Sequence, residues 1–203
     1  MYDRATYQAV AALHIQMLDK SFLATMGPLF LTELYRAMDL AQDCTLIVER
    51  DGNQLLGFVT GGRSMGPIYR AMLPRVFIWG WALGARLLSP RGLKHVSDIL
   101  RYTPETGEHQ TRAELFSIAV SKEAQGKGVA QLLYSRLITY FQNQDIDSFH
   151  IMVGSALAPA HKFYKKMGAI PVCELEVHKG ERSTLFIQKT QSEEGLYGPN
   201  FPH

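Results

Sequence analysis

The sequence has 203 residues, of which 46% are hydrophobic, with 21 Lys and Arg against 19 Asp and Glu and a net charge of +2. That length suits one domain with its own core, and the ordinary composition argues against a disordered, collagenous or coiled-coil chain. The net charge is too small to indicate an overall attraction to polyanions, so we expect no nucleic-acid partner and no membrane attachment.

The cysteines and histidines follow no metal-binding or redox pattern. Cys44 and Cys173 lie far apart, and the seven histidines form no pair at metal-ligand spacing. We therefore expect no metal, and two buried thiols in a reducing cytoplasm. The N-terminus carries no signal-peptide core, and the longest apolar stretch, Val76–Leu88, is too short and interrupted to span a bilayer. A cytoplasmic protein is the expectation.

The first part of the chain predicts two helices and a hairpin. An extended start at Tyr2–Ala5 leads into a helical pattern, and a second helix follows Gly27, with apolar residues at the helical period. Two strand patterns flank a turn around Gly52 and predict a β-hairpin, over Thr45–Glu49 and Gln54–Thr60.

The segment Arg63–Arg112 differs from the rest of the chain. It contains both tryptophans, and from Arg63 to Arg101 it has seven Lys or Arg residues against one acid. We expect two helices here, around Ile68–Leu87 and Leu93–Tyr102. Three interpretations stay open: an amphipathic cap with a solvated basic side, a lid that admits an anionic acceptor, and a homodimer contact through the tryptophan face.

The last part of the chain alternates strands and helices. Leu115–Val120 is a nearly unbroken apolar run, which is typical of a strand covered on both faces. An amphipathic helix starts at Val129, a short strand covers Phe149–Val153, and a further helix ends at Gly168. A loose tail from Gln191 follows the last hairpin, whose strands we expect at Pro171–His178 and Arg182–Gln188.

The stretch Gln125–Ala130 has the composition of an anion-binding loop. Gly126 and Gly128 let a pyrophosphate approach the backbone, the helix N-terminus offers unsatisfied N–H groups, and Lys127 adds a positive charge. A plain glycine turn that starts a helix is the competing interpretation, because a lone Gly-x-Gly is a weak signal. The loop does not match the Walker pattern. It does not match the dinucleotide-binding pattern Gly-x-Gly-x-x-Gly either, because Gln131 stands where that pattern needs its third glycine.

The pattern Gln-x-x-Gly-x-Ala at Gln125–Ala130 resembles the signature of the GCN5-related N-acetyltransferase (GNAT) family. A second stretch, Ala160–Ala169, is similar to the family's Ala-x-x-Phe-Tyr-x-x-x-Gly-Phe segment, and the chain from Asp3 to His14 resembles its first strand and helix. The resemblance covers nearly the whole chain. It implies a single α/β domain over residues 1–190, with a mixed, mostly antiparallel sheet flanked by helices, a helical basic insertion at 63–112 between strands 3 and 4, and a flexible tail at 191–203.

The resemblance further implies that acetyl-CoA donates an acetyl group to a small-molecule primary amine by direct transfer in a ternary complex. In such proteins the signature holds the CoA pyrophosphate, and the preceding strand pairs with the pantetheine arm while one amide polarises the thioester carbonyl. The family often has an Asn that contacts the pantetheine at the start of the fourth helix, where this chain has Leu157. The nearby Ser155 is the expected substitute for this contact. The implied cofactor-binding residues are Ile118, Ala119, Val120, Gln125, Gly126, Lys127, Gly128, Val129, Ala130 and Ser155.

Two catalytic residues follow from the same resemblance. Tyr164 matches the tyrosine that protonates the thiolate leaving group, with core packing as its competing role. Glu114 occupies the place of the glutamate base in some members, with a solvated strand-end carboxylate as the alternative. Desolvation would raise its pKa toward neutrality, and strand alternation places it on one face with Phe116, Ile118 and Val120. The alternative functions are transfer from a longer acyl-CoA and a non-catalytic CoA-binding module.

Overall fold

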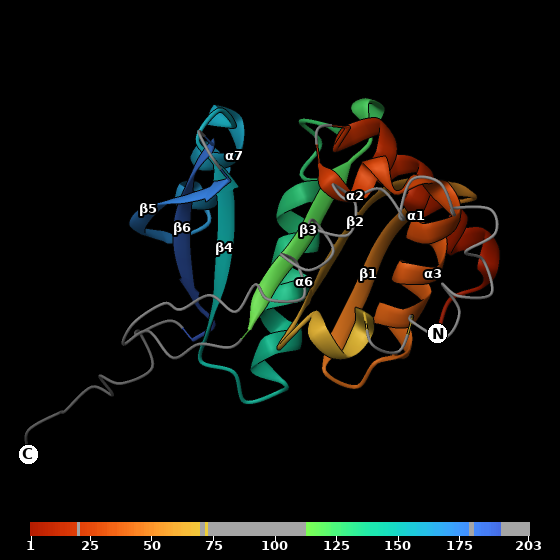
Figure 1. The fold of residues 1–203 in the computed structure, drawn as a ribbon, viewed down its shortest axis with the longest axis horizontal. Helices are drawn as coiled ribbons and strands as arrows, with labels where there is room; N and C mark the ends of the chain where they lie inside the picture. The colour runs from red at the N-terminus through yellow and green to blue at the C-terminus, as the bar shows by residue number, and fades with distance from the viewer. Residues whose placement is uncertain (20, 70–71, 73–112, 179–180, 192–203) are drawn as a thin grey trace, which may run out of the picture.

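The computed structural model describes residues 1–19, 21–69, 72, 113–178 and 181–191. These residues form a mixed six-stranded sheet with helices on both faces (Figure 1). The strands are β1 Cys44–Asp51, β2 Gln54–Gly62, β3 Glu114–Val120, β4 Ser148–Gly154, β5 Ile170–His178 and β6 Glu181–Lys189. Their order is β1-β2-β3-β4-β6-β5, and all neighbours are antiparallel except β3 and β4. The expected mixed, mostly antiparallel sheet is confirmed.

The helices also agree with the sequence patterns. They are α1 Arg4–Met17, α2 Phe22–Thr25, α3 Gly27–Leu40, the 3-10 turn η1 Lys122–Ala124, α6 Val129–Gln142 and α7 Ala158–Lys166. The short helix α2 was not expected. Residues 66–69 are helical. The two helices expected within 63–112 otherwise lie outside the described residues, as does the tail beyond Gln191.

The extended start expected at Tyr2–Ala5 is wrong, because the chain enters a helix directly. The Asp3 carboxylate is the N-cap of α1, where it accepts hydrogen bonds from the Thr6 N–H at 2.8 Å and from the Thr6 hydroxyl. A cap of this kind satisfies an N–H group that a helix start would leave without a partner, so helix is favoured from Arg4 onward. Segment 63–112 therefore lies between the second and third strands of the described sheet, not between the third and fourth.

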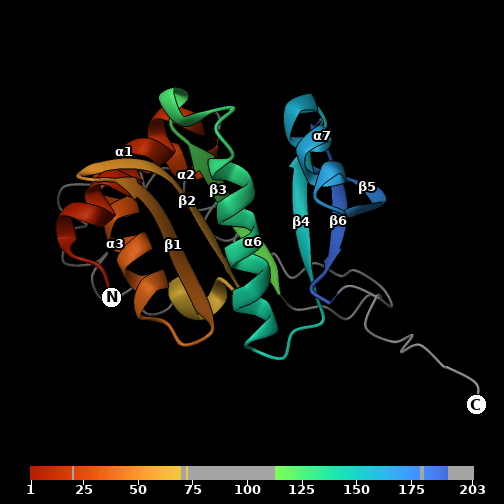
Figure 2. The same cartoon turned by 180° about the vertical axis from the view of Figure 1, so that it is seen from behind.

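Two apolar cores lie on opposite faces of the sheet. The α6-side core packs α6 and α7 against the sheet, with Leu133, Tyr134, Phe141, Phe149 and Phe186 fully buried. Figure 2 shows both helices on that near face. The α1-side core packs α1 and α3 against the other face, with Val10, Leu31, Leu34, Tyr35 and Phe58 at its centre. β3 contributes Leu115 to the first core and Ala119 to the second, so the apolar run correctly predicted a strand covered on both faces.

A β-bulge in β3 overturns the predicted alternation along that strand. Thr60 of β2 pairs with Ser117 and Gly61 pairs with Leu115, so Phe116 has no opposite residue in β2. An extra residue of this kind shifts the phase of the side chains. Phe116 therefore packs into the α1-side core, whereas Ile118 and Val120 pack into the α6-side core.

The end of β2 requires a glycine at position 62. A Cβ atom there would lie 2.5 Å from the Asp43 carbonyl oxygen and 2.5 Å from the Cys44 sulfur, both on the neighbouring chain segment. We expect Gly62→Ala to lower the free energy of unfolding by about 1–3 kcal/mol, because overpacking against backbone cannot relax cheaply. Urea denaturation measures the change. Gly66→Ala is the control, because its Cβ would meet only the Ser64 hydroxyl at 3.5 Å; equal stability of the two variants would contradict the assignment.

Candidate active site

The parallel strands β3 and β4 separate soon after they meet. They pair only at Glu114 with His150 and at Leu115 with Ile151. Beyond this point β3 stays paired with β2 on one side, and β4 stays paired with β6 on the other. Figure 1 shows the two strands diverging toward the end of β3. Among the described residues, the β4-facing edge of β3 from Phe116 onward has no strand partner.

The loop that follows β3 presents backbone N–H groups at the open end of this gap. Gly126 and Gly128 have φ angles of 76° and 83°, in the left-handed region that glycine adopts without strain. Gly128 is the N-cap of α6, which has no side-chain cap and no acidic residue in its first turn. The amides of that first turn therefore remain available to an anion, and the helix dipole favours negative charge there.

The side chains of this loop divide between solvent and core. Gln125 and Lys127 are exposed, and the Gln125 amide donates to the Val120 carbonyl at 3.4 Å, which ties the loop to the end of β3. Val129 is buried, and Ala130 is half-buried. The predicted contacts of these last two residues would therefore come from their backbone. The structure thus brings Gln125–Ala130 next to Ile118–Val120.

Tyr164 lies on α7 at the centre of an aromatic group. It is 5% exposed, and its ring lies 5.7 Å from that of Tyr134, 5.2 Å from Phe163 and 6.1 Å from Phe186, measured between centroids. Desolvation raises the pKa of Tyr164 well above its ordinary value. The Tyr164 hydroxyl is therefore protonated at neutral pH.

Glu114 lies at the start of β3, where β3 still pairs with β4. Its neighbour Leu115 points into the α6-side core, so the Glu114 side chain lies on the α1-side face. Desolvation raises the pKa of Glu114 to about 7, and its charge contributes to raising the pKa of Tyr69 to about 12, after the burial of Tyr69 itself. A carboxyl with a pKa near 7 can act as a base at neutral pH. Glu114 and Tyr164 thus face opposite sides of the sheet.

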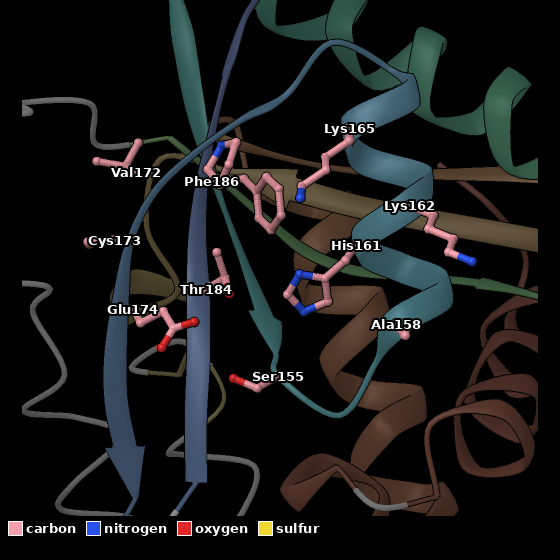
Figure 3. Close-up of a pocket in the computed structure, with 11 residues that line it drawn as sticks. Ser155, Ala158, His161, Lys162, Lys165, Val172, Cys173, Glu174, Thr184 and Phe186 are labelled. Atoms are coloured by element: carbon pink, nitrogen blue, oxygen red, sulfur yellow. The ribbon is translucent and has the colours of Figure 1, made fainter.

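Ser155 directly follows the end of β4. Its hydroxyl donates to the Arg182 carbonyl at 2.8 Å. Figure 3 shows Ser155 at the edge of a pocket of about 560 Å³ between α7 and the β5–β6 pair, which His161, Thr184 and Phe186 also line. None of the other predicted site residues lines this pocket. The role of Ser155 in binding the cofactor stays a prediction.

Sequence reasoning missed a polar group in the α1-side core. The side chain of His14 on α1 hydrogen bonds with the Tyr35 hydroxyl on α3 and with the Ser21 hydroxyl at the N-cap of α2. A histidine on an apolar helix face was the one available signal. Tyr35 does not stand out by spacing, because it lies 21 residues from His14 in the chain.

Within the described ranges, no three His, Cys, Asp or Glu side chains gather where they could hold a metal ion. Over the same ranges, no helix is long and apolar enough to cross a membrane.

Comparison with known proteins places the sequence in a family. It matches the model of the Acetyltransferase (GNAT) family over residues 12–169. No curated protein sequence matches it.

Solved structures share its fold. An N-acetyltransferase from Staphylococcus aureus Mu50 is similar with a TM-score of 0.60 and 14% sequence identity, over 94% of this chain and 96% of that one. SsHAT is similar with a TM-score of 0.61 and 16% identity, over 94% and 96%. Ard1 from Thermoplasma volcanium is similar with a TM-score of 0.58 and 13% identity, over 94% and 95%. At these identities the similarity concerns the fold.

The family match runs from within α1 to the end of α7, and it includes the glycine loop after β3 and the tyrosine helix α7. These two segments are the ones whose motifs resembled the family in the sequence. The chain therefore belongs to the GNAT acetyltransferase family and is a GNAT-type N-acetyltransferase.

Proposed function

We propose that the protein transfers the acetyl group of acetyl-CoA to a primary amine of a small molecule, by direct attack within a ternary complex. The observation that carries this proposal is the end of β3–β4 pairing at Leu115, followed by a glycine loop and an uncapped helix at the open end. A free strand edge fits the amides of a pantetheine arm, and the helix start fits a pyrophosphate.

Two segments of the chain would bind different parts of acetyl-CoA. The backbone amides of Gln125–Ala130 would hold the pyrophosphate, with Lys127 adding a positive charge. The backbone of Ile118–Val120 would pair with the pantetheine arm, and one amide there would polarise the thioester carbonyl. Acetyl-CoA supplies an activated acyl group whose leaving group is a thiolate.

Two ionisable side chains support the proton transfers. Glu114, with its pKa of about 7, is the proposed base that removes a proton from the amine. Tyr164 is the proposed donor to the thiolate. Because the two side chains lie on opposite faces of the sheet, Glu114 would approach the amine from one face and Tyr164 would approach the thiolate from the other.

The positions of the cysteines favour direct transfer over an acyl-enzyme. Burial chiefly raises the pKa of Cys44 to about 11, so this thiol is a poor nucleophile at neutral pH. Cys173 is exposed, so the expectation that both thiols are buried is wrong for this residue, but it lies on β5, which is separated from β4 by β6. Neither residue lies on a strand that borders the gap.

Thiol release tests the proposal. Acetyl-CoA should raise the melting temperature, and CoA thiol should appear only when an amine is added from a panel of amino sugars, polyamines, amino acids and peptides. Comparing acetyl-CoA with longer acyl-CoA distinguishes the acyl donors. Binding of acetyl-CoA without amine-dependent thiol release would favour a non-catalytic module, and no binding at all would refute the proposal.

We expect Tyr164→Phe to slow acetyl transfer roughly ten- to a hundredfold, because the thiolate loses its proton donor. The affinity for acetyl-CoA should change little, since the ring stays in place. Steady-state kinetics and calorimetry measure the two effects. An unchanged rate would leave Tyr164 with its competing role in core packing.

A further inference from the structure

The pocket between α7 and the β5–β6 pair has walls of opposite charge. Its volume of about 560 Å³ lies within the range of small-molecule sites. Lys162 and Lys165 line it from α7, and Glu174 lines it from β5. Figure 3 shows Lys165 reaching from the helix toward Phe186, and the Glu174 carboxylate reaching from β5 toward β6. A ligand in this pocket would therefore lie between ammonium groups on one wall and a carboxylate on the other.

The fold does not use these charges for its own ion pairs. Within the part of the chain that the structure describes, no ion pair or side-chain hydrogen bond engages Lys162, Lys165 or Glu174. All three residues are exposed. Their charged groups are therefore available to a ligand, and binding one would not require the protein to break an internal ion pair.

His161 adds a hydrogen-bond acceptor whose direction is fixed. Its Nε2 lies 3.0 Å from the Gly154 carbonyl oxygen, which can only accept, so Nε2 carries a hydrogen. In the neutral ring, Nδ1 then has a lone pair that can accept an N–H group. The ring also packs edge-on against Phe186, with centroids 5.5 Å apart and planes at 64°. Phe186 is fully buried and gives the pocket an apolar floor.

The mixture of charges argues against two simpler classes of ligand. A phosphate or another plain anion would be attracted by the lysines but repelled by Glu174. A polyamine would be attracted by Glu174 but repelled by Lys162 and Lys165. A molecule that carries one group of each sign is attracted by both walls. An apolar side chain on that molecule would leave water for the surface of Phe186.

We propose that this pocket binds a zwitterionic small molecule of the amino-acid class. Its carboxylate would lie at Lys165, its ammonium group between Glu174 and His161 Nδ1, and an apolar side chain against Phe186. This site is separate from the gap between β3 and β4, because Ser155 is the only predicted cofactor or catalytic residue among those that line it. The proposal therefore goes beyond the proposed acetyl transfer and does not depend on it.

Matched ligands test the class of molecule. The probe is L-phenylalanine, and its analogues are phenylpropionate, which lacks the ammonium group, and phenethylamine, which lacks the carboxylate. We expect calorimetry without acetyl-CoA to show that L-phenylalanine binds about tenfold more tightly than either analogue, because only it engages both walls. L-phenylalanine that binds no more tightly than the analogues, or does not bind, would overturn the proposal.

Charge-removing variants test the two walls separately. Lys165→Gln should weaken L-phenylalanine about tenfold without weakening phenethylamine, which has no carboxylate. Glu174→Gln should weaken L-phenylalanine to a similar degree without weakening phenylpropionate. Lys166→Gln is the matched control, because it removes the same charge from the next residue of α7, which does not line the pocket. Equal affinities in Lys165→Gln and Lys166→Gln would contradict the proposed contact.

NMR distinguishes this pocket from an acceptor site, which is needed because amino acids also belong to the amine panel. L-phenylalanine should shift the amide resonances of residues 158–165 and 171–174, and the nitrogen-15 resonance of His161 Nδ1, while those of β3 stay in place. Shifts confined to β3 would mean that the amino acid binds as an acceptor, and would overturn this proposal while leaving the proposed function intact. Absence of thiol release with every amine would refute the proposed function and leave this result unaffected.

Discussion

We expect Gly128→Glu to weaken CoA binding about a thousandfold and to abolish the rise in melting temperature caused by acetyl-CoA. The new carboxylate would stand at the N-cap of α6, where the pyrophosphate is proposed to bind. Two like charges about 4 Å apart in an effective dielectric of about 20 repel by about 4 kcal/mol, which corresponds to about three orders of magnitude in affinity. Isothermal calorimetry with CoA measures the change.

This variant needs a control for backbone strain, because Gly128 has a φ angle of 83°. Gly52→Glu places the same side chain on another glycine with a positive φ angle, 55°, in the β1–β2 turn. Space is not limiting at either position, since a Cβ on Gly52 would meet nothing within 4 Å and one on Gly128 only the Gln131 side chain at 3.6 Å. Gly52→Glu should keep CoA affinity. Unchanged affinity in Gly128→Glu would refute the assignment of the loop.

The second large effect is expected for Glu114→Gln, which should lower kcat/KM about a hundredfold at pH 8. The base acts in its ionised form, so the activity of the wild type should rise with pH through about 7, the pKa of Glu114. Glutamine does not ionise, and this limb of the pH profile should disappear in the variant. A limb that persists in Glu114→Gln would show that another group, or water, removes the proton.

The same substitution should stabilise the protein at high pH. The pKa of Glu114 is raised from 4.5 to about 7 by desolvation, so between these pH values the folded state binds more protons than the unfolded state. Stability of the wild type should therefore fall as pH rises through this window. Glu114→Gln should exceed the wild type by roughly 1–3 kcal/mol at pH 8 and match it near pH 4. Urea denaturation at the two pH values measures this, and a difference that does not vary with pH would indicate a solvated carboxylate.

Local patterns in the sequence predicted most of the fold. The helical period at α3 and α6, the glycine turn between β1 and β2, and the apolar run of β3 all became the expected elements. These signals succeed because each depends on residues close together in the chain. The prediction for the start of the chain was wrong because the Asp3 side-chain cap favours a helix over a weak strand propensity. Hydrophobic periodicity does not reveal that competition.

Some features of the candidate site could be predicted from the sequence, and others could not. Gln125–Ala130 and Tyr164 could be predicted because their motifs are contiguous, and a loop that starts a helix has much the same geometry wherever it occurs. The position of Glu114 relative to Ile118 could not, because a bulge depends on how β3 registers against β2. The hydrogen bond from the Ser155 hydroxyl to the Arg182 carbonyl could not be predicted either, because it joins residues 27 positions apart.

The length, composition and near-neutral charge of the chain indicated one globular domain, and two short motifs indicated its family. The tertiary structure alone decided three points: that β3 leaves β4 after Leu115, that Glu114 is desolvated and not a solvated strand-end carboxylate, and that His14 pairs with Tyr35 in the α1-side core. Each arises from residues that are distant in sequence and meet when α1, α3 and the sheet pack together. Strand pairing, desolvation and long-range hydrogen bonds are properties of that packing, so no local pattern of residues encodes them.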